Sequence, residues 1–524
     1  MGKSSRTEAF IKTIFRTVVV VTVFSTLDQL GGFVYRIFLS RALGAEGLGN
    51  YQIATSVIFV MFSVAASGLP FVLGTKIAEY EQSKNFEAAN GHVTAGLVLG
   101  VALSTAVVIG FLLFQKPLAR LTGKPEIMRM IIFMLPSVYA VSLSSVFRGA
   151  LWGKKEFFAH SGLEVIEQLI RLTLAFLLFR GNVSPAEKGF YASIVFSATC
   201  FLTTLASYLL FRKHGGKFGA PALYLKPILK SAVPLSGIRI AGNAFQSAIA
   251  VLFPFLLVKL AHFTGAEAIA EYGILSGMTM PVLFFPIIFV TALSTTLLPE
   301  IAGELKNNRP ERVRYLMQKA IHFSMLFGGL GLGCFLAFGP QLCYVLFDNL
   351  QAGIYLRFSC ILMIPLSLCM LTTNLLSSLG LEYKSTKNYV LGAAVLLLCL
   401  VCLTAKLRAY SVIVAAICGV GITAFLNLRQ ICRTIQLKAD FLGTFWKLVA
   451  FSVFSALSGI LLNDALTKRL PDTFCMILCI CLTLGIFLYL TTTFRTADIN
   501  YMWKLLFRSP YRTFRKNKIF RKTK

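Results

Sequence analysis

The sequence predicts an all-α polytopic membrane protein with about 14 transmembrane helices. Of its 524 residues, 56% are hydrophobic, only 14% are charged, and apolar runs of 20 or more residues recur along the chain. A soluble domain usually has about 25% charged residues, and about 20 apolar residues cross a bilayer as a helix. The composition therefore excludes a soluble enzyme or a nucleic-acid-binding protein.

The expected helices are joined by short loops that leave no room for a large soluble domain. Their ranges are 14–42, 48–80, 86–115, 126–152, 157–180, 187–213, 226–260, 267–302, 312–339, 351–380, 385–406, 410–436, 441–463 and 472–495. Prolines inside these ranges remove backbone hydrogen bonds, and Pro281 and Pro286 predict a bend in the eighth helix.

An internal duplication predicts how the helices are grouped. Residues 51–54 (Tyr-Gln-Ile-Ala) resemble residues 272–275 (Tyr-Gly-Ile-Leu), and each segment lies near the start of a long helix. Because this offset contains an even number of helices, both repeats have the same topology. We expect an N-terminal lobe over 1–220, a second lobe over 221–438, and two further helices over 439–495, with a cavity between the lobes.

The distribution of Lys and Arg predicts the orientation in the membrane. With the N-terminus in the cytoplasm, inner segments hold 35 of the 51 Lys and Arg residues and outer loops hold 13. One outer loop, with Lys116, Arg120 and Lys124, departs from this bias. Both termini are expected inside, at the cell membrane. The basic tail over 496–524 predicts either an anchor on anionic lipids or a docking site for a partner protein, such as one of cell-wall synthesis.

The interior of the predicted helices contains three arginines: Arg36, Arg171 and Arg239. A charge inside a membrane span is energetically costly, so each of them is expected to have a partner or a functional role. The first helix also carries Asp28, Gln29 and, near its outer end, Arg41. Gln29 and Arg36 lie on one face with Gly32, and the pair Gly31-Gly32 leaves that face open for a ligand or a neighbouring helix.

The fifth and seventh helices supply further candidates. Glu167 and Arg171 form an i, i+4 pair that can neutralise itself, and a proton or cation relay through Glu164 or Glu167 is the alternative. Polar residues also form a stripe along the seventh helix: Ser236, Arg239, Asn243 and Gln246. Arg239 has no acidic residue within reach on its own helix. It requires an anionic ligand or an interhelical partner such as Asp28 or Glu164.

No catalytic, cofactor-binding or metal-binding motif accompanies these charges. The five histidines are scattered, and the sequence contains no HExxH, GxSxG or Walker motif. The Cys399-x-x-Cys402 pair lies in an apolar run, where cysteine usually packs as a small hydrophobic residue. We expect no enzyme activity, no metal and no cofactor. Two arginines facing one cavity would suit a phosphate or diphosphate ligand.

Five segments carry a family resemblance: residues 32–52, 67–70, 76–79, 165–171 and 272–281. Together they resemble the stage V sporulation protein B family of the MOP exporter superfamily. The resemblance implies a MATE/MurJ-like fold that alternates between inward- and outward-open states. It also implies movement of an undecaprenyl-diphosphate-linked oligosaccharide across the membrane, with Arg36 and Arg239 binding the diphosphate.

Gln29 departs from the family pattern, because related members commonly have Arg at this position. The loss of that charge favours a lipid-linked glycan other than lipid II, or a binding site in which another group compensates for the missing arginine.

The alternative function is a MATE-like antiporter for small organic cations, which two cavity arginines would repel. A membrane scaffold that does not transport is a third interpretation. Coupling to a proton or sodium ion through Asp28, Glu164 or Glu167, and coupling to the membrane potential, both stay open.

Overall fold

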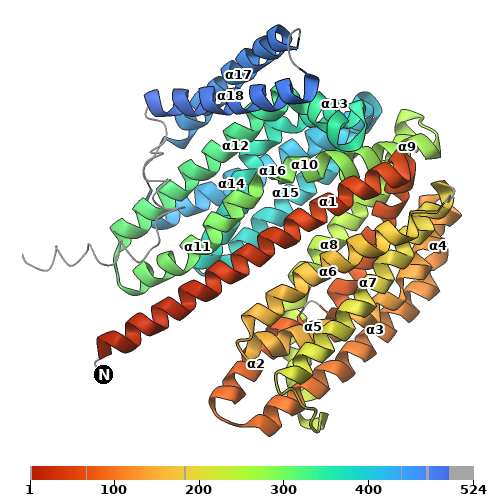
Figure 1. The fold of residues 1–524 in the computed structure, drawn as a ribbon, viewed down its shortest axis with the longest axis vertical. Helices are drawn as coiled ribbons and strands as arrows, with labels where there is room; N and C mark the ends of the chain where they lie inside the picture. Colours follow the sequence, from red (N-terminus) through yellow and green to blue (C-terminus); the bar gives the residue numbers. More distant parts are fainter. Residues whose placement is uncertain (1–2, 67, 182–184, 438–439, 468–470, 495–524) are drawn as a thin grey trace, which may run out of the picture. The chain divides into compact units, whose positions relative to one another are not determined.

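The computed structural model describes residues 3–66, 68–181, 185–437, 440–467 and 471–494. The basic tail predicted over 496–524 lies outside these residues. Helices account for the regular structure of the described residues, as expected for the all-α class (Figure 1). The chain forms two compact units, Met1–Pro281 with Thr404–Ala409, and Val282–Leu403 with Tyr410–Lys524.

The first unit contains the helices that carry most of the predicted site residues. Its elements are α1 (Lys3–Ala66), α2 (Leu69–Gln82), α3 (Phe86–Thr122), α4 (Pro125–Met134), α5 (Pro136–Gly153), α6 (Phe157–Leu178), α7 (Pro185–Lys213), η1 (Ala222–Tyr224), α8 (Leu225–Ala261), α9 (Gly265–Tyr272) and the π-helical η2 (Gly273–Thr279). The short helix α10 (Met280–Phe284) contains the boundary with the second unit.

The second unit continues with long helices. Its elements are α11 (Ile287–Lys306), α12 (Pro310–Phe347), α13 (Leu350–Ser359), η3 (Cys360–Leu362), α14 (Met363–Ser378), α15 (Glu382–Leu407), η4 (Arg408–Tyr410), α16 (Ser411–Ile435), α17 (Phe441–Leu466) and α18 (Asp472–Thr493). Residues 404–409, at the end of α15 and the start of η4, group with the first unit.

Local sequence signals explain where several helices begin and end. Asn85 caps α3 by accepting a hydrogen bond from the Ala88 N–H, at 3.1 Å, and the helix ends at Gly123 in the left-handed conformation. Thr264 and Glu267 form a capping box at the start of α9. Gly44, with φ 68° and ψ −177°, breaks α1 into two helical segments, close to the boundary expected between the first two helices.

Several predicted helices are interrupted where proline or a tight contact requires it. The range 48–80 breaks between α1 and α2, just before Pro70, and the range 126–152 breaks at Pro136. The bend expected at Pro281 and Pro286 is present, because α10 ends at Phe284 and α11 begins at Ile287. The π-helical turn η2 packs against α1 and lies within the range 267–302 that was predicted as one helix.

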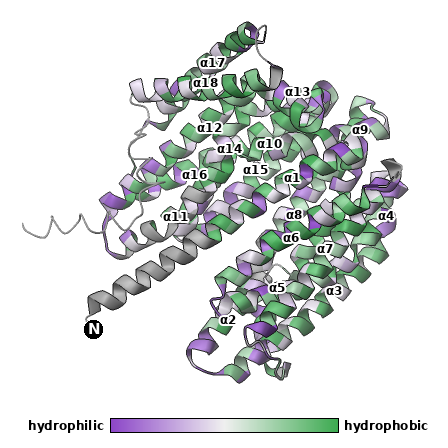
Figure 2. Ribbon diagram, viewed as in Figure 1, coloured by the Kyte–Doolittle hydropathy of each residue, from purple (hydrophilic) through white to green (hydrophobic). Residues whose placement is uncertain are grey.

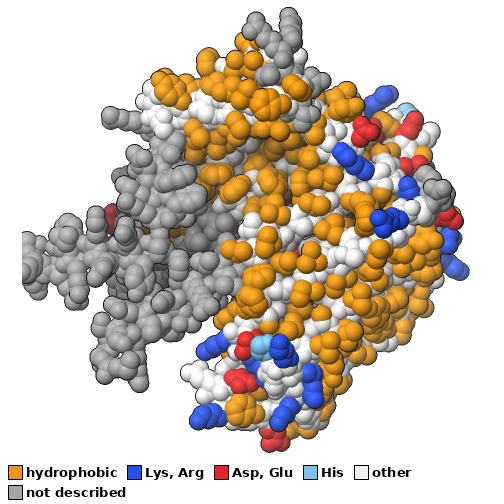
Figure 3. All heavy atoms as spheres, in the orientation of Figure 1, with side chains coloured by type: hydrophobic (Ala, Val, Ile, Leu, Met, Phe, Trp, Pro, Cys, Tyr) orange, Lys and Arg blue, Asp and Glu red, His pale blue; other side chains and the backbone are white. Residues whose placement is uncertain are grey.

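The structure shows a multi-pass membrane protein. Ten helical stretches of the described residues are long and apolar enough to cross a membrane, so the count of 14 spans stays a prediction. Figure 2 shows hydrophobic residues along most of the length of the first unit's helices, with hydrophilic residues gathered at their ends. On the face shown in Figure 3, a hydrophobic band of the first unit lies between two groups of charged side chains. This pattern is that of a unit surrounded by lipid.

Close helix contacts in the first unit depend on glycine. A Cβ atom on Gly49 would lie 2.1 Å from the Ile269 carbonyl oxygen, and a Cβ on Gly68 would lie 2.5 Å from the Ala232 carbonyl oxygen. The first contact holds α9 against α1, and the second holds α8 against the start of α2. The lobe boundary predicted at residue 220 assigns α8 to the second lobe, whereas α8 belongs to the first compact unit of the structure. The lobe boundaries at 220 and 438 concern internal symmetry and stay a prediction.

The second unit buries small and apolar side chains between α12, α17 and α18. Cys475 and Cys479 are buried there with Phe338 and Met476. This packing agrees with cysteine acting as a small hydrophobic residue in this unit. Polar contacts also occur: Asn388 donates to Asn427 Oδ1 at 2.9 Å, and Asn427 donates to Thr373 Oγ1 at 3.3 Å, joining α15, α16 and α14.

The Gly49→Ala substitution tests the glycine contact. We expect it to lower the free energy of unfolding by about 1–3 kcal/mol, because the added methyl group overlaps the backbone of α9. The measurement is the thermal unfolding midpoint of the detergent-solubilised protein. Gly110→Ala on α3 is the control, since its Cβ would meet no atom within 4 Å. Equal midpoints for the two variants would contradict this account of the α1–α9 packing.

Candidate functional site

A chain of polar contacts joins α1, α5 and α6 within the first unit. Gln168 Nε2 on α6 donates to Asp28 Oδ1 on α1 at 2.9 Å, and Arg171 Nη1 donates to Gln168 Oε1 at 3.3 Å. Arg171 Nη2 also donates to Glu167 Oε1 at 2.7 Å, and Arg148 Nη2 on α5 donates to Glu167 Oε2 at 2.8 Å. We call these five residues, together with Glu164, the α1–α5–α6 cluster.

Glycine and aromatic residues position α6 against α1. A Cβ on Gly31 would lie 3.0 Å from Gln168 Cβ, so a larger residue would crowd the side chain that reaches Asp28. Edge-to-face ring pairs lie on either side of this contact, Phe24 with Phe158 at 5.2 Å and Phe38 with Phe179 at 5.8 Å. Because these contacts advance together along both helices, α1 and α6 run parallel. The face left open by Gly31 and Gly32 is thus covered, at least in part, by a neighbouring helix.

The ion pair predicted between Glu167 and Arg171 is present, and Glu167 also pairs with a second arginine that was not predicted. Glu167 binds two arginines, and its side chain is 24% exposed, against 16% for Arg171 and 21% for Arg148. The Arg171 guanidinium also lies 5.7 Å from the centre of the Tyr35 ring. Assigning only three arginines to helix interiors was wrong, because Arg148 lies within α5. Its partner is on another helix, so no spacing in the sequence indicated the contact.

The cluster contains more acidic than basic side chains. Three carboxylates (Asp28, Glu164 and Glu167) share two guanidinium groups, and Asp28 and Glu167 have the hydrogen bonds given above. Glu164 lies within electrostatic range of Asp28, Arg148 and Glu167. It forms no hydrogen bond or ion pair with any residue in the described part of the chain. Glu164 is therefore the carboxylate of the cluster that has no direct hydrogen bond or ion pair among the described residues, whereas Asp28 has the Gln168 amide and Glu167 has two arginines.

Arg36 differs from the arginines of the cluster. It is exposed on the segment of α1 before Gly44, and within the described residues it forms no hydrogen bond or ion pair. Gln29, also exposed, makes only a long contact from Nε2 to Ser25 Oγ, at 3.5 Å, among the described residues. Arg41 is exposed near the turn at Gly44. A guanidinium in an apolar span with no counter-charge is available for an anionic ligand.

The polar stripe of α8 faces the α1 segment after Gly44. Asn243 Nδ2 donates to the Phe59 carbonyl at 3.3 Å, and Ser236 is buried against Gly68. Arg239 and Gln246 are exposed on the same helix. Arg36 therefore lies on α1 itself, in the segment before Gly44. Arg239 lies on α8, which packs against the α1 segment after Gly44. Their convergence on one cavity stays a prediction.

Glu167→Gln tests whether the cluster holds α5 and α6 together. The change weakens its hydrogen bonds to both arginines and leaves neither guanidinium with a carboxylate in direct contact among the described residues. We expect a loss of about 1.5–3 kcal/mol in the free energy of unfolding, read as a lower unfolding midpoint in detergent.

The matched control is Glu79→Gln. Glu79 pairs with Lys76 at 2.8 Å, but their side chains are 63% and 43% exposed. An exposed pair contributes about 0–1 kcal/mol, so this variant should unfold near the wild-type midpoint. If both variants lose the same stability, the cluster has no special structural role.

The chain is similar to two proteins of Bacillus subtilis (strain 168). It is 24% identical over 367 residues to stage V sporulation protein B of Bacillus subtilis (strain 168), covering 66% of this chain and 69% of that protein. It is 22% identical over 320 residues to the lipid II flippase MurJ of the same organism, covering 55% of this chain and 57% of that one.

The fold is also found in a solved structure. The lipid II flippase MurJ in an inward closed conformation matches with a TM-score of 0.66 and 14% identity, over 91% of this chain and 98% of that chain. The predicted MurJ-like fold class is thus confirmed. The family described as "Polysaccharide biosynthesis protein" matches residues 14–303, more than half of the sequence. The chain belongs to this polysaccharide biosynthesis protein family.

Proposed function

We propose that this protein is a flippase that moves an undecaprenyl-diphosphate-linked oligosaccharide across the cytoplasmic membrane by alternating access. The observation that carries the proposal is Arg36, an exposed guanidinium in an apolar span with no counter-charge among the described residues. A diphosphate can accept paired hydrogen bonds from such a group. Membership of the polysaccharide biosynthesis family, and a relative named as a lipid II flippase, support the lipid-linked substrate class.

The charges on α1 and α8 favour an anionic substrate over an organic cation. Arg36, Arg41 and Arg239 are all exposed on these two helices, and like charges would repel a cationic drug. Gln29 is also exposed on α1, on the same face as Arg36, and it is neutral where the family resemblance implies a further arginine. The substrate we propose is accordingly a lipid-linked glycan that needs fewer cationic contacts than lipid II. Both termini would lie in the cytoplasm.

Arg36→Ala should reduce binding of the lipid-linked glycan at least tenfold, because a charge-assisted hydrogen bond contributes about 1.5–3 kcal/mol. The measurement is native mass spectrometry of the gently purified protein, with the bound polyprenyl-diphosphate glycan identified by its mass. Arg239→Ala should reduce binding in the same direction.

Arg180→Ala is the control for charge. Arg180 is exposed beyond the end of α6, with its guanidinium 4.7 Å from the centre of the Phe176 ring. It should keep wild-type binding. Wild-type protein that carries only bulk phospholipid, or an Arg36→Ala variant that retains the glycan, would contradict the proposal.

We also propose that Glu164 carries the coupling cation. Asp28 and Glu167 are occupied by hydrogen bonds, whereas Glu164 adds negative charge to the cluster without a direct partner in the described chain. A proton or sodium ion bound there would offset that charge. Because α6 contacts both α1 and α5, uptake of the cation would alter the contacts that hold these helices together.

Glu164→Gln should abolish the stimulation of transport by a proton or sodium gradient, while binding of the lipid-linked glycan remains. The measurement is the initial transport rate in proteoliposomes with each gradient imposed separately. Glu79→Gln, at an exposed carboxylate, should keep the stimulation. A Glu164→Gln variant that still responds to the gradient would exclude this residue. Transport driven by membrane potential alone would exclude ion coupling.

A further inference from the structure

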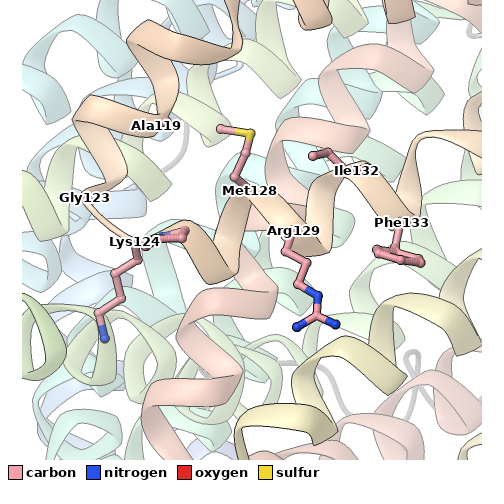
Figure 4. A pocket seen from close by; sticks show the side chains of 8 residues that line it. Ala119, Gly123, Lys124, Met128, Arg129, Ile132 and Phe133 are labelled. Atoms are coloured by element: carbon pink, nitrogen blue, oxygen red, sulfur yellow. The ribbon is translucent and has the colours of Figure 1, made fainter.

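A cavity of about 520 Å³ lies where α3 meets α4 (Figure 4). Its lining residues are Ala119, Gly123, Lys124, Pro125, Met128, Arg129, Ile132 and Phe133. Two stretches suited to crossing a membrane end here, Phe86–Arg120 and Pro125–Gly153. The cavity therefore lies at the boundary between hydrocarbon and water, which is the depth of lipid headgroups.

The lining is amphipathic. Lys124 extends from the start of α4 and Arg129 from its next turn (Figure 4). Beside them, Ile132 and Phe133 are 44% and 43% exposed. A ligand that satisfies both parts has an anionic head and a hydrocarbon body.

Neighbouring groups hold the two cations without using all their donors. Arg129 lies with its guanidinium 4.5 Å from the centre of the Phe190 ring, which leaves its N–H groups at the edge available. Lys124 forms an ion pair with Glu46 on α1, and its ammonium group has three donors. The nearby Glu126 accepts a hydrogen bond from Asn50 Nδ2 at 3.2 Å.

The charge around the cavity favours an anion. Lys116 and Arg120 are exposed in the last turns of α3, so this end of α3 and α4 carries four cations, with Glu46 and Glu126 as the acidic residues described beside them. Three of these basic residues, Lys116, Arg120 and Lys124, are the ones that departed from the predicted positive-inside distribution. A local function would explain why they occur on the predicted outer side, where Lys and Arg are otherwise depleted.

We propose that this cavity binds an anionic glycerophospholipid, with the phosphate between Lys124 and Arg129 and the acyl chains along Ile132 and Phe133. Such a lipid would tie α3 and α4 to the outer leaflet. The site is separate from the glycan-binding residues, so it stands or fails independently of the proposed transport function.

The test uses the full-length protein in lipid nanodiscs with phosphatidylglycerol that carries a photoreactive headgroup. Adducts are mapped by mass spectrometry, and we expect them in residues 116–133. At low probe concentration, Lys124→Ala and Arg129→Ala should each reduce these adducts about fivefold, as expected for one basic residue near an anionic lipid. Glu46→Gln should increase them, because it removes the carboxylate that competes for Lys124.

Two further variants separate the contributions of shape and charge. Ala119→Phe fills the cavity without changing its charge and should also remove the adducts. Arg180→Ala is the matched control, because that arginine packs on Phe176 much as Arg129 packs on Phe190. It should leave the adducts unchanged.

Four results would overturn the proposal. They are no adduct in residues 116–133 of the wild type, an equal yield from a phosphatidylcholine probe, no change in both Lys124→Ala and Arg129→Ala, and displacement by inorganic phosphate as effective as by unlabelled phosphatidylglycerol. The last result would identify a site for a free anion instead of a lipid.

Discussion

A charged side chain in an apolar span needs a partner, and this constraint organises the first unit. The α1–α5–α6 cluster satisfies it by sharing Glu167 between Arg148 and Arg171 and by linking Asp28 to them through Gln168. The shared contacts fix α6 against α1 and α5. Removing one charged member leaves its partner without that direct contact, which destabilises the packing of all three helices.

Arginines in this unit have two different environments. Arg148 and Arg171 are held by carboxylates, whereas Arg36 is exposed and has no counter-charge among the described residues. The first two can stabilise the fold, and the third is available to a ligand. Glu164 is the corresponding case among the acids, because it adds negative charge to the cluster without a direct contact. This difference is why we assign substrate binding to Arg36 and ion coupling to Glu164.

Sequence periodicity predicted most helices and the i, i+4 pair of Glu167 with Arg171, because both depend on residues close in the chain. It also indicated that Gly31 and Gly32 leave one face of α1 open, although not which residue covers it. Gln168 and Arg148 could not be placed, since their partners lie on other helices. The break before Pro70 and the π-helical turn η2 were missed because each is a short feature inside a long, mainly apolar range.

We propose that this member of the polysaccharide biosynthesis family moves an anionic lipid-linked glycan. The most direct test is leaflet exchange of a fluorescent undecaprenyl-diphosphate oligosaccharide in reconstituted vesicles, followed by chemical quenching from outside. We expect exchange well above the rate in protein-free vesicles, with no uptake of a fluorescent organic cation such as ethidium. Uptake of the cation without exchange of the lipid would contradict the proposed function.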